Sequence, residues 1–170
     1  MPAVGWQQKC GITRVAQEDD YGCGVACLAM VTGRSYSQAR QDFAGLGFTA
    51  RRTGRPALAV TLAELRMAVF SAGHIAEPRR WKGWNSFEGL GIFKMKDDWR
   101  GPEGRNRWHW VVAFRHRDFG VTVLDPHQVT PSFEHMPMDE VCLLFSVYQP
   151  TGHWLQVEQR IPLTIDATQA

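Results

Sequence analysis

The chain has 170 residues, of which 44% are hydrophobic and 21% are charged, and its formal net charge is +2. This is the length of about one domain, so we expect a single unit over 1–170 that buries its own core. The small net charge argues against a dedicated nucleic-acid binder, and four cysteines are too few for a disulfide scaffold.

The first half of the sequence predicts three helices. Residues 25–31 are almost wholly apolar, so the first helix should be central and buried, and Gly33 suits the left-handed position after its end. Two further helices, one running to about Ala44 and one ending near Gly73, are each opened by the spacing of a capping box. The two capping boxes are Ser35 with Gln38 and Thr61 with Glu64. A basic loop over 49–60 carries three arginines that we expect to be solvated: Arg51, Arg52 and Arg55.

The second half predicts an antiparallel sheet. Two β-branched or aromatic runs on either side of 115–120 are typical of a hairpin, and three further runs predict single strands. In chain order the expected strands are 91–96, 110–114, 121–124, 141–148 and 154–161. Polar, turn-rich residues over 96–107 predict a long loop. Helices followed by an antiparallel sheet give the α+β class.

Cys23 lies where a polar, glycine-flanked turn gives way to the apolar helix. A cysteine at a helix N-terminus lies beside unpaired backbone N–H groups and the positive end of the helix dipole, which stabilise a thiolate relative to a thiol. Cys27 is one turn further along the same face, where burial should keep it inert. Cys10 has no helix start behind it and Cys142 opens an apolar strand, so we expect both to be structural. We therefore predict Cys23 as a nucleophile, although a single cysteine is by default an ordinary buried thiol.

His109 begins one strand of the expected hairpin and Asp125 ends the other. If the two residues oppose each other, the turn centres on Arg117 and Asp125 can accept a hydrogen bond from the imidazole. A three-residue loop over 118–120 would instead pair Asp125 with Ala113, too far from His109 for a direct bond. The sequence does not choose between these registers, and a slip of one residue would send the two side chains to opposite faces.

Gln17 lies six residues before Cys23, in the loop that leads into the helix. Its side-chain amide could donate to the oxygen of a carbonyl under attack, beside the backbone N–H of Cys23. Such donors contribute roughly 3–4 kcal/mol of transition-state stabilisation. Taken alone, a glutamine in a polar loop is more often only solvated.

Four segments together resemble the papain-like cysteine peptidases, in particular the double-glycine (bacteriocin-leader) peptidases and their stand-alone relatives. The segments are Gln17, Asp-Tyr-Gly-Cys-Gly-Val-Ala-Cys-Leu over 20–28, His-Trp-Val-Val over 109–112 and Val-Leu-Asp-Pro over 123–126. The resemblance covers about residues 15–128 and implies a papain-like α+β fold. It implies Cys23 as nucleophile, His109 as base, Asp125 as the residue that orients the base and Gln17 as oxyanion donor.

The sequence departs from that group at several points. Gly22, directly before the cysteine, stands where the group more often has an acidic or otherwise polar residue, and the segment before His109 is long. The ATP-driven transporter that often follows such a domain does not follow here, which argues against a dedicated bacteriocin-export role.

The predicted activity is hydrolysis of a peptide or amide bond in a peptide or protein substrate, with no metal or organic cofactor. The same residues could run deamidation or acyl transfer, because only the incoming and leaving groups differ. The rival is a non-catalytic peptide-binding module that uses the same groove. The sequence identifies neither the substrate nor the oligomeric state.

Other candidate sites carry weaker signals. A zinc site at Cys23 and Cys27 lacks the paired Cys-x-x-Cys or short His-x-His spacing that zinc sites use, so no metal is expected. Tryptophans and basic residues interleave over 81–110, which can bind nucleic acid by stacking, but acidic residues dilute the charge. We expect core or groove lining there, with 96–107 as a candidate flap. The remaining histidines are expected on the surface or in the core: His74, His116, His127, His135 and His153.

The N-terminal segment lacks the pattern of a secretory signal, because residues 1–9 are polar and mixed. No apolar run approaches the ~20 residues that a membrane span needs. We expect a protein of a reducing, cytoplasmic compartment that needs no membrane. Export by a route without a cleaved signal, as an effector acting on another protein, is the alternative.

Overall fold

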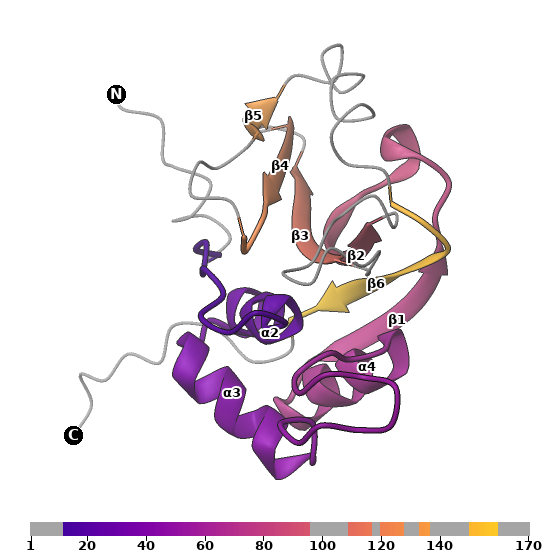
Figure 1. The fold of residues 1–170 in the computed structure, drawn as a ribbon. Helices are drawn as coiled ribbons and strands as arrows, with labels where there is room; N and C mark the ends of the chain where they lie inside the picture. The colour runs from indigo at the N-terminus through magenta and orange to yellow at the C-terminus, as the bar shows by residue number, and fades with distance from the viewer. Residues whose placement is uncertain (1–11, 96–108, 117–119, 128–132, 137–149, 160–170) are drawn as a thin grey trace, which may run out of the picture.

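The fold was analysed in a computed structural model that describes residues 12–95, 109–116, 120–127, 133–136 and 150–159. Helices come first and strands follow, so the predicted α+β class is confirmed (Figure 1). In chain order the elements are α2 (Cys23–Thr32), α3 (Tyr36–Gly45), α4 (Leu62–Ser71), β1 (Ile75–Arg80), the 3-10 helix η1 (Trp84–Ser86), β2 (Gly89–Met95), β3 (His109–His116), β4 (Gly120–Leu124), β5 (Phe133–Met136) and β6 (His153–Glu158). None of the described helices is long and apolar enough to cross a bilayer.

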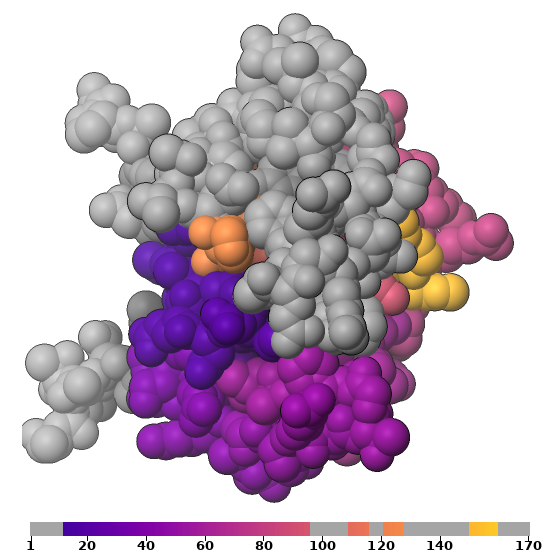
Figure 2. All heavy atoms as spheres, in the orientation of Figure 1, coloured from indigo at the N-terminus to yellow at the C-terminus, as the bar shows by residue number. Residues whose placement is uncertain are grey.

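The helices begin and end where the local sequence predicts. Every residue of α2 after Cys23 is buried, because this apolar helix contacts β3 as well as α3 and α4. Gly33 ends α2 in the left-handed conformation, with φ of 69°. Both capping boxes form, with the side chain and backbone N–H bonded reciprocally at Ser35 with Gln38 and at Thr61 with Glu64. In the space-filling view the helical half forms one continuous region, coloured indigo to magenta (Figure 2).

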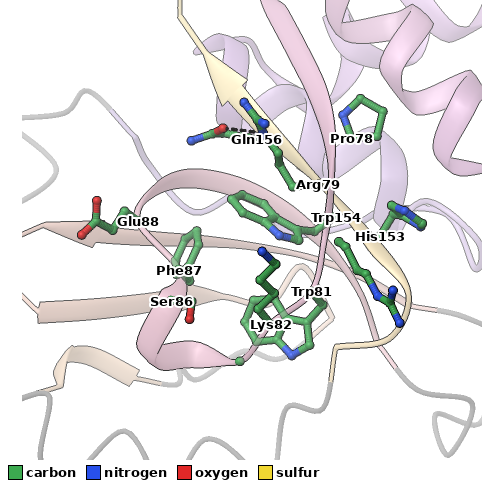
Figure 3. A pocket seen from close by; sticks show the side chains of 12 residues that line it. Pro78, Arg79, Trp81, Lys82, Ser86, Phe87, Glu88, His153, Trp154 and Gln156 are labelled. Carbon is green, nitrogen blue, oxygen red and sulfur yellow. Dashed lines mark hydrogen bonds between the residues drawn. The ribbon is translucent and has the colours of Figure 1, made fainter.

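The sheet is antiparallel throughout, with strand order β1-β6-β2-β3-β4-β5. Alternate residues of β2 face two different cores, as the pleat requires. Ile92 joins the core beneath the helices, whereas Phe93 joins an aromatic core on the other face of the sheet. That second core includes Trp84, Phe87 and Trp154, and Figure 3 views part of it from outside.

Two strands were not predicted from the sequence. β1 contains Pro78 and four exposed residues, a composition that lacks the apolar alternation of an ordinary strand but is typical of an edge strand. β5 is four residues long. The predicted hairpin is confirmed as β3 and β4, and the last predicted strand as β6. The expected strand over 141–148 and the expected loop over 96–107 lie outside the described residues.

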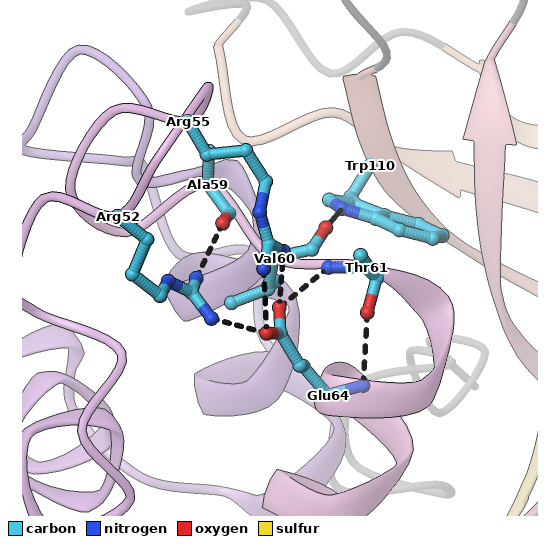
Figure 4. Close-up of polar contacts among 7 residues, drawn as sticks. All are labelled: Arg52, Arg55, Ala59, Val60, Thr61, Glu64 and Trp110. Atoms are coloured by element: carbon cyan, nitrogen blue, oxygen red, sulfur yellow. Dashed lines mark hydrogen bonds and ion pairs between the residues drawn. The ribbon is translucent and has the colours of Figure 1, made fainter.

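Two of the arginines that we expected to be solvated are half-buried, so that prediction is wrong for Arg52 and Arg55. Both bind the carboxylate of Glu64, the residue of α4 that completes the capping box with Thr61, and Arg52 Nη2 also donates to the carbonyl oxygen of Ala59 at 2.7 Å (Figure 4). The next carbonyl along, that of Val60, accepts a hydrogen bond from the Trp110 ring N–H at 3.2 Å. The ion pairs therefore hold this loop in contact with β3.

We predict that Glu64→Gln lowers the free energy of unfolding by about 1–3 kcal/mol at neutral pH, because it leaves two half-buried guanidinium groups without their carboxylate. Burial alone would raise the pKa of Glu64, but hydrogen bonds from Arg55, the Thr61 N–H and Arg52 lower it overall. A lowered pKa adds stability above the ordinary value of 4.5, and this stability is lost as the pH falls through the folded-state value. The difference between the two proteins should therefore shrink in acid, as measured by chemical denaturation.

The matched control is Glu77→Gln, since Glu77 is exposed and lies 3.8 Å from Arg66. This variant should unfold almost as the parent does. Equal losses in the Glu64 and Glu77 variants would contradict the role assigned to the buried cluster.

Candidate active site

The candidate nucleophile is the first residue of α2. Cys23 is half-buried, and the residue before it, Gly22, caps the helix without a side chain that could accept from the first-turn N–H groups. The first turn also contains no acidic residue. The first-turn N–H groups and the positive end of the helix dipole are therefore directed at the space beside the sulfur, where they favour a negatively charged atom.

Position 22 needs a glycine because a side chain would not fit there, and not because of its backbone conformation. Its φ of −85° is open to any residue, but a Cβ atom built on it would lie 1.9 Å from the Tyr36 hydroxyl oxygen and 3.1 Å from the Asp19 carbonyl oxygen. The Tyr36 hydroxyl donates to Asp19 Oδ2 at 2.7 Å. Burial and this carboxylate raise the pKa of Tyr36, so the donor stays protonated. The turn before Cys23 is thus fastened to α3 at a point where a larger residue would clash.

His109, the first residue of β3, binds Asp125 directly. The distance from His109 Nε2 to Asp125 Oδ1 is 2.8 Å, and the two side chains are only 3% and 1% exposed. The backbone N–H of His127 donates to the same oxygen at 2.9 Å. Two donors on one oxygen hold the carboxylate in place.

The observed register lies between the two that the sequence left open, so neither is correct. Val112 pairs with Leu124 and Ala113 with Val123. When this register is extended by one residue, Asp125 lies opposite Val111. His109 is two residues before Val111 and so shares its face of the strand. A diagonal pair of this kind is within reach of long side chains, which accounts for the bond to Asp125.

Cys23 is hydrogen-bonded to the same imidazole. Since Asp125 occupies Nε2, Nδ1 is left for the sulfur. Burial by itself lowers the pKa of His109, but the hydrogen bonds to Asp125 and to Cys23 and the nearby charges outweigh it and raise the pKa to about 9. Sulfur, imidazole and carboxylate are therefore in contact in series, and the imidazole favours its charged form.

Gln17 connects the loop before α2 to the end of β4. Its backbone N–H donates to the carbonyl oxygen of Pro126 at 3.0 Å. Its side-chain Nε2 donates to the carbonyl oxygens of Asp19 at 3.0 Å and Asp20 at 3.3 Å. Among the described residues, its Oε1 is buried without a hydrogen-bond partner. In this arrangement the amide N–H groups are directed at the turn that precedes Cys23.

A further residue at the site, Arg14, was not predicted from the sequence. Its Nε donates to the backbone carbonyl of Asp125 at 2.9 Å, across 111 residues of sequence. Together with the Gln17 backbone bond, it fastens the N-terminal segment beside the candidate base. An isolated arginine before the helix has no local pattern that would predict this contact.

Other predicted residues lie apart from this series or beside it. Cys27 is fully buried, and burial first, then the charges of Cys23 and Asp125, raise its pKa. His127 is exposed, with its ring centroid 6.3 Å from that of His109. His74 is buried, and His153 is exposed in β6. Cys10 and Cys142 lie outside the described residues.

The solved structures that share this fold include two peptidases. A double-glycine motif protease from an AMS/PCAT transporter, in complex with the leader peptide, matches with a TM-score of 0.54 and 19% identity, over 87% of this chain and 91% of that one. The fold is that of the double-glycine peptidases. A candidate C39-like peptidase from Bacillus anthracis also shares the fold of this chain, with a TM-score of 0.51 and 14% identity over 88% of this chain and 96% of its own. No protein-family model and no curated protein matches the sequence.

We predict that Gly22→Ala costs about 1–3 kcal/mol of stability, because the added methyl group forces the Tyr36 hydroxyl out of its place. Tyr36→Phe alone should cost about 1 kcal/mol through the lost hydrogen bond to Asp19. The double variant should be less destabilised than the sum of the two, because the phenyl ring leaves more room for the methyl group. Denaturant unfolding of all four proteins gives the coupling energy.

Gly45→Ala is the matched control, since a Cβ atom there has no neighbour within 4 Å. It should leave the free energy of unfolding unchanged or raise it slightly. Strict additivity between Gly22→Ala and Tyr36→Phe would show that the clash does not govern this position.

Proposed function

We propose that the protein is a cysteine-dependent hydrolase of peptide or amide bonds, with Cys23 as nucleophile and His109 and Asp125 as its base and orienting residue. The observation that carries this proposal is the serial contact of sulfur, imidazole and carboxylate at the start of a buried helix. A nucleophile beside a base, with the base held by a third group, is the arrangement that covalent acyl transfer requires. The shared fold with peptidases supports the same reaction class.

In the first half of the reaction, the Cys23 sulfur attacks the substrate carbonyl carbon and the carbonyl electron pair moves onto oxygen. The backbone N–H of Cys23 stabilises that oxyanion. The His109 imidazolium then gives its proton to the leaving amine as the carbon–nitrogen bond breaks, which leaves a thioester on Cys23. Asp125 accepts from Nε2 throughout and keeps Nδ1 directed at the reacting atoms.

In the second half, neutral His109 takes a proton from water, and the resulting hydroxide attacks the thioester. The carbon–sulfur bond breaks, the acid product leaves, and the Cys23 sulfur again lies beside the His109 imidazolium. Gln17 supplies the second oxyanion donor. Of the two hydrogen bonds that Gln17 Nε2 donates, the one to the Asp20 carbonyl is the longer. A substrate oxyanion that replaced the Asp20 carbonyl would accept this N–H, and the bond to the Asp19 carbonyl would stay in place.

A peptide is the substrate class best supported. One of the structural relatives was solved with a leader peptide bound, which is a property of that protein. For this chain we propose a peptide or protein substrate on the basis of the shared fold and of the chemistry of the Cys23–His109 pair. Deamidation and acyl transfer use the same first half-reaction and differ in what then attacks the thioester.

We predict that Cys23 reacts with iodoacetamide faster in the wild-type protein than in His109→Ala, because the His109 imidazole, whose pKa is raised to about 9, stays positively charged beside the sulfur at neutral pH. Alkylation rates of the two proteins, measured side by side at pH 7, test this. Cleavage of peptides in a mixed library, followed by mass spectrometry, should disappear in Cys23→Ala and survive in the control Cys27→Ala. Identical alkylation rates for wild type and His109→Ala would refute the activated thiol. His109-dependent alkylation without cleavage of any peptide would favour the transferase or binding-module alternatives.

A further inference from the structure

A second concave site lies on the face of the sheet away from the helices. It is a recess of about 520 Å³ between β1, β6 and the segment 81–88, called the β1–β6 recess below (Figure 3). This volume lies within the range of pockets that hold small ligands or peptide side chains. Nothing in the proposed reaction uses it.

The floor of the β1–β6 recess is aromatic and rigidly packed. Trp81, Phe87 and Trp154 line it, and Phe87 meets Trp154 edge-on with ring centroids 5.3 Å apart. Trp154 also stacks on buried Phe93 at 5.0 Å and lies so close to Gly91 that a Cβ atom there would be 2.6 Å from the indole ring. The rings are therefore fixed before any ligand arrives.

The rim of the recess is basic. Three exposed cations, Arg79, Arg80 and Lys82, line it, against a single acidic residue, Glu88. The Arg79 guanidinium already makes one hydrogen bond, because its Nε donates to Gln156 Oε1 at 3.1 Å. In Figure 3 the Lys82 side chain extends toward the centre, beside the Trp154 ring, whereas Glu88 lies at the far side. Arg79 and Arg80 belong to the edge strand β1 and Lys82 follows it, so the positive charge lies along one strand edge, where an extended acidic segment can run beside it.

The recess is separate from the candidate active site. The residues that line it include none of Cys23, His109, Asp125 and Gln17. β6, which lines the recess, and β3 are two strand positions apart in the sheet, about 10 Å at the usual spacing between strands. An extended peptide advances about 3.3 Å per residue, so about three residues or more must separate groups that occupy the two sites.

We propose that the β1–β6 recess binds an acidic peptide segment in which carboxylate side chains flank an apolar or aromatic one. The apolar side chain lies on the Trp81, Phe87 and Trp154 floor, and the carboxylates pair with the cations of the rim. This inference rests on the proposed peptide hydrolase function and gives it a substrate class: peptides with such a segment about three residues or more from the bond that is cut.

The test uses the full chain carrying Cys23→Ala, so that no probe is turned over. The probe is a fluorescein-labelled peptide Gly-Glu-Phe-Glu-Gly-Gly, and the matched peptide has Gln in place of both Glu residues. Anisotropy should show saturable binding of the Glu peptide, with about ten-fold weaker binding of the Gln peptide and after Lys82→Glu. The control Arg51→Glu makes the same charge change at an exposed arginine outside the recess and should alter affinity less than two-fold. Raising the salt concentration from 50 to 500 mM should weaken binding further.

Equal binding of the Glu and Gln peptides, or equal effects of Lys82→Glu and Arg51→Glu, would overturn the inference. Binding of ATP with no binding of the Glu peptide would also overturn it and assign the recess to a nucleotide. Failure of the recess proposal can be told apart from failure of the hydrolase proposal, because the reactivity of Cys23 toward iodoacetamide is measured in the wild-type protein without any peptide. An unreactive Cys23 together with Lys82-dependent peptide binding would leave the recess standing and the hydrolase refuted.

Discussion

The hydrogen bond between His109 and Asp125 is the interaction on which the rest of the candidate site depends. Both side chains are almost fully removed from water, and a buried carboxylate or imidazolium without a partner is strongly destabilised. Each side chain is the hydrogen-bond partner of the other, and the backbone N–H of His127 is a second donor to the Asp125 carboxylate. The same bond fixes which ring nitrogen is left for Cys23, and so it decides whether the sulfur has a base at all.

The fold brings this bond to the tip of α2 through contacts that are distant in sequence. Trp110, next to His109, is held by the Val60 carbonyl, whose loop is fastened by the Arg52, Arg55 and Glu64 cluster. Gly24 in the first turn of α2 leaves room for Val60, since a Cβ atom there would lie 2.8 Å from it. The basic loop is therefore part of the scaffold that sets the position of β3 against the helix that carries Cys23.

Local signals predicted the helices and the hairpin, because capping boxes, apolar runs and turn residues act over a few positions. The register could not be predicted in this way: shifting the turn by one residue changes the partner of Asp125 without changing any local pattern. The edge strand β1 was missed because its exposed, proline-containing sequence carries no core signal. The contacts of Arg14 and of Tyr36 with the site were also missed, since they join segments that only the tertiary fold brings together.

The most direct measurement of the central claim is an NMR titration of the His109 ring nitrogens in the wild-type protein and in Asp125→Asn. The account predicts that the wild-type imidazole keeps both protons through neutral pH and loses one near pH 9. In Asp125→Asn the transition should move to lower pH, because the group that most strongly raises the pKa of His109 against burial is gone. A wild-type ring that titrates near 6.5, or one whose titration is unchanged by the substitution, would contradict the serial contact of sulfur, imidazole and carboxylate.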